Sequence, residues 1–137
     1  MNFLKNLFGK SKTEQAAYGF VSETPGKGLS PEEASALQEQ LQSVLTSTND
    51  VHTKINYAAR LMTSQQYELC IQAYEKIAED HPEERATCES QIGVAHFFLG
   101  DYEKAIQFYK QALEHGEDAD MMADNIAEAE EALAKKR

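Results

Sequence analysis

The chain contains little of what marks secreted, membrane-spanning or disulfide-stapled proteins. Its 137 residues include no tryptophan, two cysteines and three prolines. Cys70 and Cys88 lack the close spacing of redox and zinc motifs and suit a reducing compartment, so we interpret both as packing residues. No apolar run approaches the roughly 20 residues of a membrane-spanning helix, and the core of a signal peptide is missing too. These shortages predict a cytoplasmic protein.

Basic side chains are also scarce. Lysine and arginine total 13 against 23 aspartates and glutamates, so the formal net charge is -10. Lys5, Lys10 and Lys12 stand in the first part of the chain without any acid beside them, which leaves the remainder still more acidic. Proteins bind phosphate backbones through clusters of Lys and Arg. We therefore expect no nucleic acid among the partners.

Signals for β-strands are nearly absent, whereas signals for helices recur along the chain. The stretch Ser30-Pro31-Glu32-Glu33 is a strong helix start. The serine hydroxyl can accept from a free backbone N–H, proline suits the first turn, and Glu33 can complete a capping box. An apolar stripe follows at helical spacing and predicts a helix over 31–46: Leu37, Leu41, Val44 and Leu45.

Two stretches of the chain repeat each other at an offset of about 35 residues, a period typical of stacked supersecondary units. Tyr67, Glu68, Ile71, Gln72, Tyr74 and Glu79 recur as Tyr102, Glu103, Ile106, Gln107, Tyr109 and Glu114. A helix, a tight turn and a second helix occur twice, and we predict these helices over 51–64, 67–80, 83–98 and 102–115. A last helix is predicted over 119–136, with Met122, Ile126, Ala129 and Leu133 at core spacing.

The pattern Glu89-x-x-Ile92-Gly93-x-x-His96, followed by Ala105-x-x-x-Tyr109, resembles a tetratricopeptide repeat, whose motif is Trp-x-x-Leu-Gly-x-x-Tyr, then Ala-x-x-x-Phe, then Pro. The preceding copy places Lys54, Tyr57, Ala58, Leu61, Cys70, Tyr74 and Pro82 in the same roles. Neither copy has the opening Trp, and the second has Glu117 in place of the closing Pro. The resemblance implies an all-α fold of antiparallel helix-turn-helix repeats, stacked as a short right-handed solenoid.

Composition and resemblance together divide the chain into three parts. Residues 1–10 form a short basic amphipathic segment, and residues 11–29 form a flexible linker rich in Ser, Thr, Gly and Pro. Residues 30–137 form a helical domain. Within it we expect a flanking helix at 31–46, repeats at 51–82 and 83–116, and a capping helix at 119–136. The two added helices are needed because each repeat buries its faces only against its neighbours.

Members of this family usually bind ligands along the concave surface lined by the first helix of each repeat. The resemblance therefore implies a non-catalytic adaptor that holds a peptide or helix of a partner protein. The corresponding positions form an apolar groove with an acidic end: Ile55, Ala59, Met62, Ser90, Val94, Phe97, Phe98, Met121, Asp124 and Glu128.

The resemblance also makes one kind of ligand doubtful. Family members that grip the C-terminal carboxylate of chaperone tails use Lys, Asn and Arg on this surface. The matching positions here hold Ile55, Ala59, Ser90 and Val94. Asp124 and Glu128 would moreover repel a carboxylate, so we expect a basic or apolar ligand.

The first segment has an apolar face, made by Phe3, Leu4, Leu7 and Phe8. Three roles stay open for it: a tail without a role, weak peripheral contact with the inner membrane surface, and docking into the groove. The alternative function is a self-associating structural scaffold, recruited to a membrane through this segment. Monomer and homo-oligomer therefore both stay open.

No group of residues has the spacing of a catalytic or metal-binding motif. Gly26-Lys27 lacks the glycine spacing and the following Ser or Thr of a phosphate loop. The four histidines show no metal-ligand spacing, and the acids around Glu117 lack the order of a calcium loop. We predict no enzyme activity, no catalytic residue, no metal site and no cofactor.

Overall fold

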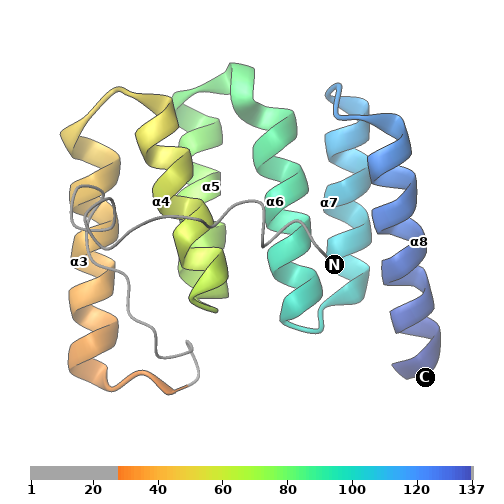
Figure 1. The fold of residues 1–137 in the computed structure, drawn as a ribbon, viewed down its shortest axis with the longest axis horizontal. Coiled ribbons are helices and arrows are strands. Elements are labelled where there is room, and N and C mark those ends of the chain that lie inside the picture. Colours follow the sequence, from red (N-terminus) through yellow and green to blue (C-terminus); the bar gives the residue numbers. More distant parts are fainter. Residues whose placement is uncertain (1–27, 137) are drawn as a thin grey trace. The chain divides into compact units, whose positions relative to one another are not determined.

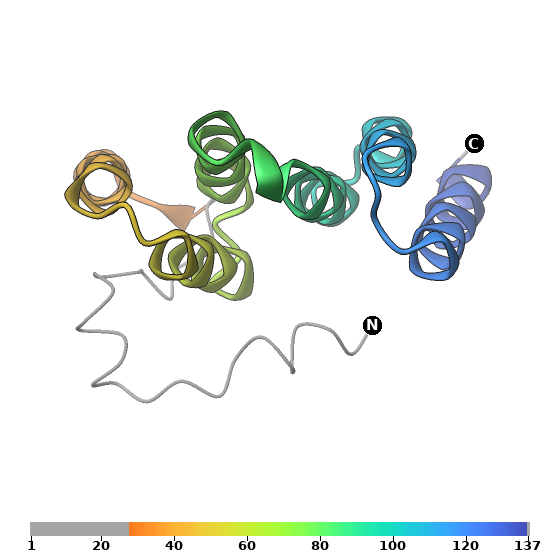
Figure 2. The same cartoon turned by 90° about the horizontal axis from the view of Figure 1, so that it is seen from above.

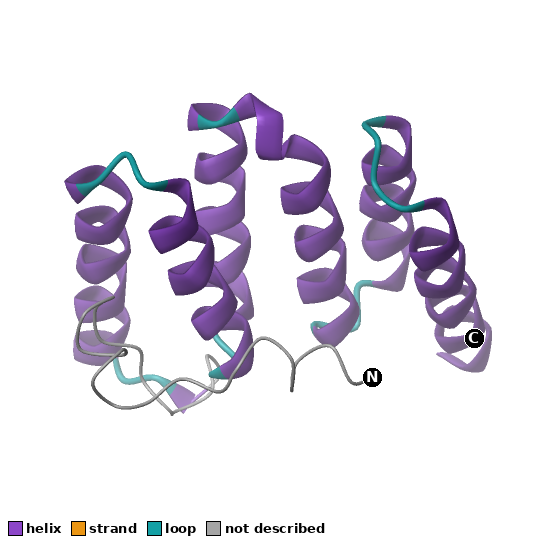
Figure 3. Ribbon diagram, turned by 45° about the horizontal axis from the view of Figure 1, so that its top comes forward, coloured by secondary structure: helices purple, strands orange, loops and turns teal. Residues whose placement is uncertain are grey.

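The computed structural model of the protein describes residues 28–136, and this part is helical with no strand (Figure 3). The predicted all-α fold is confirmed. In chain order the elements are α3 (Pro31–Ser47), α4 (Val51–Thr63), α5 (Tyr67–Asp80), the 3-10 turn η2 (Pro82–Glu84), α6 (Arg85–Phe98), α7 (Tyr102–Glu114) and α8 (Ala119–Lys136).

The described part of the chain divides into two compact units, with the boundary between Ala73 and Tyr74 inside α5. In the first unit, α3 begins as predicted at a capping box. The backbone N–H of Glu33 donates to Oγ of Ser30 at 3.1 Å, and the N–H of Ser30 donates to Oε1 of Glu33 at 3.3 Å. The predicted apolar stripe is buried over its whole length: Leu37, Leu41, Val44 and Leu45.

The second helix of the first unit, α4, is capped by Asp50. Its carboxylate accepts from the backbone N–H of His52 at 3.2 Å and from the hydroxyl of Thr53 at 2.8 Å. The helix ends in a tight turn in which Gln65 takes a positive φ of 61°. The chain then returns as α5, and the amide of Gln38 donates to the side-chain oxygen of Gln72 at 3.0 Å, which connects α3 to α5.

The second unit contains the end of α5, then η2, α6, α7 and α8. Successive helices α6, α7 and α8 run antiparallel and side by side (Figures 1 and 2). The helix predicted over 83–98 starts later than expected, at Arg85. The preceding Pro82–Glu84 turn is 3-10, with the N–H of Glu84 donating to the carbonyl of His81 at 2.9 Å.

A close approach between α6 and α7 is centred on Gly93. A Cβ atom placed there would lie 2.7 Å from Cδ1 and Cε1 of Tyr109 and 3.2 Å from the carbonyl oxygen of Ala105. Only a residue without a side chain fits this distance, so the small residue of the repeat motif has a direct physical reason here. Of the four residues expected on the buried side of α8, Met122 and Ala129 are buried, whereas Ile126 and Leu133 are half-buried.

Candidate protein-binding site

The predicted groove positions on α8 are all exposed. Met121 is 44% exposed, and Asp124 and Glu128 are exposed as well. Positions separated by three and seven residues lie on one face of a helix. The first half of α8 thus presents a large apolar side chain together with two carboxylates, a surface called here the Met121 face. Within residues 28–136, the other exposed large apolar side chain is Leu113, at 40%.

The predicted groove positions at the end of α6 are half-buried aromatics. The rings of Phe97 and Phe98 are edge-on to each other, with centroids 5.9 Å apart. Phe97 also meets the ring of Tyr102 at 5.2 Å, so it connects the end of α6 to the start of α7. Both phenylalanines keep some accessible surface, and Phe97 has a structural contact besides.

The predicted groove positions in the middle of α6 are interior. Ser90 is 2% exposed and Val94 is 3% exposed. The hydroxyl of Ser90 donates to the carbonyl of Thr87 at 2.8 Å and lies 3.3 Å from Oε2 of Glu117. These side chains therefore offer a ligand little area of their own.

The predicted groove positions of the first unit all lie on α4. Ile55 is half-buried, whereas Ala59 and Met62 are buried at 4% and 1% exposure. A partner would therefore reach Ile55 and not the other two. The amphipathic segment with Phe3, Leu4, Leu7 and Phe8 lies outside the described residues.

A polar clamp between α6 and the α7–α8 connection was not foreseen from the sequence. Glu89, whose side chain is 8% exposed, has its Oε1 2.6 Å from Nδ1 of His115 and 3.9 Å from Nε of Arg85. One residue along α6, Ser90 contacts Glu117, whose Oε1 accepts the backbone N–H of Asp118 at 3.0 Å. The clue in the sequence was the presence of acids at two motif positions that are apolar in the family, the opening Trp and the closing Pro.

The buried thiols and phenols are in their protonated forms near neutral pH. Burial raises the pKa of Cys88 to about 12 and the pKa of Cys70 further, so neither is a thiolate nucleophile. Burial likewise raises the pKa of Tyr57 to about 12. Residues 28–136 contain no cluster of three or more His, Cys, Asp and Glu side chains arranged to hold a metal ion.

A family model for the tetratricopeptide repeat matches residues 50–118, which is just over half of the chain. The chain belongs to the tetratricopeptide-repeat family. The match begins at Asp50, the cap of α4, and ends at Asp118, whose carboxylate accepts the N–H of Met121 in the first turn of α8 at 2.8 Å. It therefore covers the two helix pairs α4–α5 and α6–α7. No curated protein matches the chain at a significant level.

Tetratricopeptide repeats generally mediate protein–protein interactions and form a family of non-catalytic interaction modules. Protein partners are accordingly the class that membership indicates. None of the helices in the described part of the chain combines the length and hydropathy needed to cross a bilayer.

Proposed function

We propose that this tetratricopeptide-repeat protein is a non-catalytic adaptor that binds a peptide or helix of a partner protein on the Met121 face. The observation that carries the proposal is the 44% exposure of Met121 beside two exposed carboxylates on one helix face. An apolar patch rimmed by polar groups marks an interaction site. In this proposal Met121 is the apolar anchor of the contact.

The charges on the Met121 face define the partner's chemistry. Asp124 and Glu128 favour a segment that carries Lys or Arg next to an apolar side chain. Acidic residues outnumber basic ones by more than two to one in residues 74–137, so the unit as a whole attracts the same kind of segment. Phe97 and Phe98 lie at the end of α6 beside Tyr102, at the opposite end of the helices from Met121, so they are not part of this face.

The proposed site can be tested with Met121→Ala because this change removes exposed apolar area and does not disturb the core. Partners of the tagged full-length chain would be recovered by affinity purification and quantified by mass spectrometry. A partner that is recovered with the wild type should be recovered in smaller amount with Met121→Ala. In a separate experiment, it should also be recovered in smaller amount with the double variant Asp124→Asn and Glu128→Gln.

Leu113→Ala is the matched control. Leu113 is exposed to a similar degree, at 40%, but lies on α7 outside the proposed face. Its substitution should leave partner recovery unchanged. Equal losses with Leu113→Ala and Met121→Ala, or no loss with either of the Met121-face variants, would exclude this face as the binding site.

A further inference from the structure

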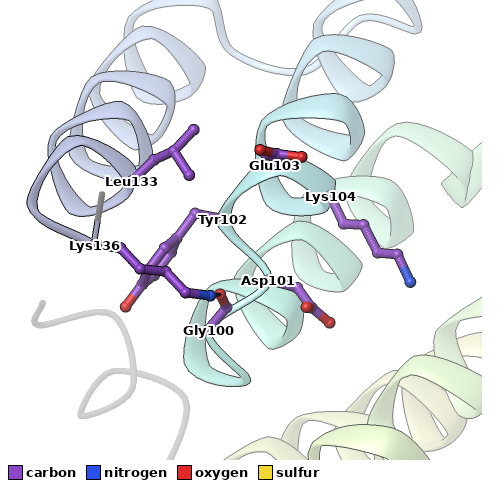
Figure 4. Close-up of a pocket in the computed structure, with 7 residues that line it drawn as sticks. All are labelled: Gly100, Asp101, Tyr102, Glu103, Lys104, Leu133 and Lys136. Carbon is purple, nitrogen blue, oxygen red and sulfur yellow. Dashed lines mark hydrogen bonds between the residues drawn. The ribbon is translucent and has the colours of Figure 1, made fainter.

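A pocket of about 470 Å³ lies at the far end of α8 from the Met121 face. It is formed where the turn between α6 and α7 meets the last turn of α8 (Figure 4). Fifteen positions along α8 separate Met121 from Lys136, which corresponds to about 22 Å along a helix. The pocket is lined by Gly100, Asp101, Tyr102, Glu103, Lys104, Leu133 and Lys136.

One wall of the pocket holds an ammonium group. Nζ of Lys136 donates to the carbonyl oxygen of Gly100 at 3.2 Å and lies 5.7 Å from the centroid of the Tyr102 ring. Gly100 lies in the turn between α6 and α7 with a φ of 84°, and its carbonyl oxygen is the acceptor of this hydrogen bond. An aromatic ring face attracts a cation, and a backbone carbonyl oxygen accepts a hydrogen bond from an ammonium group.

The remaining lining residues suit a lysine side chain and not a bare ion. Leu133 is half-buried and provides an apolar wall for the methylene stem, which lysine buries while its charge stays at the rim. The ring of Tyr102 is held edge-on by Phe97, so the aromatic wall has a fixed orientation. The pocket therefore pairs an apolar wall with a cation-binding end.

The charge of the lining also favours a cation. Asp101 and Glu103 are acidic, and the other base besides Lys136 is Lys104, whose side chain extends away from Lys136 (Figure 4). Without Lys136 the lining would carry an excess of negative charge. Lys135 behaves differently, because its ammonium pairs with Glu131 at 3.1 Å on the exposed surface.

We propose that this pocket is a binding site for a lysine side chain of a protein partner, and that in the free chain Lys136 makes the contacts with Gly100 and Tyr102 that the partner's lysine would take. Lys136 is exposed, so the ammonium group of a partner's lysine can compete with it for the carbonyl oxygen of Gly100. A partner's lysine would displace Lys136 and take over its contacts with Gly100 and Tyr102. The site is separate from the Met121 face, so either can fail without the other.

The test uses the ¹⁵N-labelled full-length chain and the peptide acetyl-Ala-Lys-Ala-amide as the probe. In Lys136→Ala the amides of Gly100, Tyr102 and Leu133 should shift saturably as the peptide is added. The wild type should show the same pattern with weaker apparent affinity, because only the fraction in which Lys136 has left these contacts can bind. Adding Tyr102→Leu to Lys136→Ala should weaken binding by about two- to fivefold, the range expected for an exposed cation–ring contact.

Two controls decide the outcome. The peptide with norleucine in place of lysine should give no saturable shift, since it keeps the stem and lacks the charge. Lys135→Ala should bind like the wild type, because Lys135 lies outside the pocket. Absence of saturable shifts in Lys136→Ala, equal binding of the norleucine peptide, or an equal gain in Lys135→Ala would each overturn the proposal.

Discussion

Nδ1 of His115 lies 2.6 Å from Oε1 of Glu89, and this contact fastens the end of α7 to the middle of α6. The carboxylate is 8% exposed, whereas the imidazole is 31% exposed. A buried carboxylate needs hydrogen-bond donors, because burial without them costs free energy. His115 and, at a longer distance of 3.9 Å, Arg85 are the groups that face it.

We expect His115→Ala to lower the free energy of unfolding by about 1–3 kcal/mol, the cost of leaving a buried acceptor without its partner. Chemical denaturation followed by circular dichroism gives this value. Glu89→Gln in the His115→Ala background should recover part of the loss, since a neutral amide is cheaper to bury than a carboxylate. A double-mutant cycle would isolate the coupling between the two residues.

The pair Lys135 and Glu131 is the matched control for the clamp. Their atoms lie 3.1 Å apart, but the side chains are 76% and 69% exposed. Exposed pairs of this kind contribute about 0.3–0.5 kcal/mol. If Lys135→Ala costs as much as His115→Ala, the burial of Glu89 is not the reason for the effect.

The helices could be predicted from the sequence because their ends depend on neighbouring residues. Ser30 and Asp50 cap the helices that follow them, and Gly100 and Gly116 take the positive φ values that the turns after α6 and α7 require. The start of α6 was misplaced, because a short 3-10 turn and a first α-helical turn have the same local signals.

The side-chain environment of the candidate site could be predicted only in part. The exposure of Met121 follows the repeat positions, but the burial of Ser90 and Val94 depends on what packs against them from distant segments. The contact of Glu89 with His115 joins side chains 26 positions apart. Such contacts leave no local pattern, and the acids at two usually apolar motif positions were the sole trace of the clamp.

Gly93→Ala should destabilise the second unit despite the better helix propensity of alanine. The new methyl group would lie 2.7 Å from two carbons of the Tyr109 ring, which is itself 1% exposed and has little room to move. Overpacking costs about 1–3 kcal/mol and the propensity gain returns at most about 1 kcal/mol, so we expect a net loss. Thermal unfolding by circular dichroism measures it.

Tyr109→Leu provides the background that tests this explanation. Leucine lacks the ring carbons that the methyl group would meet, so Gly93→Ala should cost less in Tyr109→Leu than in the wild type. An equal cost in both backgrounds would show that the clash is with the backbone of Ala105, whose carbonyl oxygen lies 3.2 Å from the position that the methyl carbon would take.

Stability should depend on pH through His96, which stacks on Phe108 with ring centroids 5.4 Å apart. Burial first, and the charge of Lys104 second, hold the pKa of His96 below its ordinary 6.5, against the opposing influence of Asp101 and Glu75. Below pH 6.5 the unfolded chain therefore binds more protons than the folded one, and stability falls as the pH falls.

His96→Phe keeps the stacked ring without a titrating group, so its stability advantage over the wild type should grow between pH 7.5 and pH 5. Lys104→Gln should remove part of the dependence by removing its second cause. Urea unfolding at several pH values measures both variants, and a constant difference between His96→Phe and the wild type would show that His96 does not titrate differently on folding.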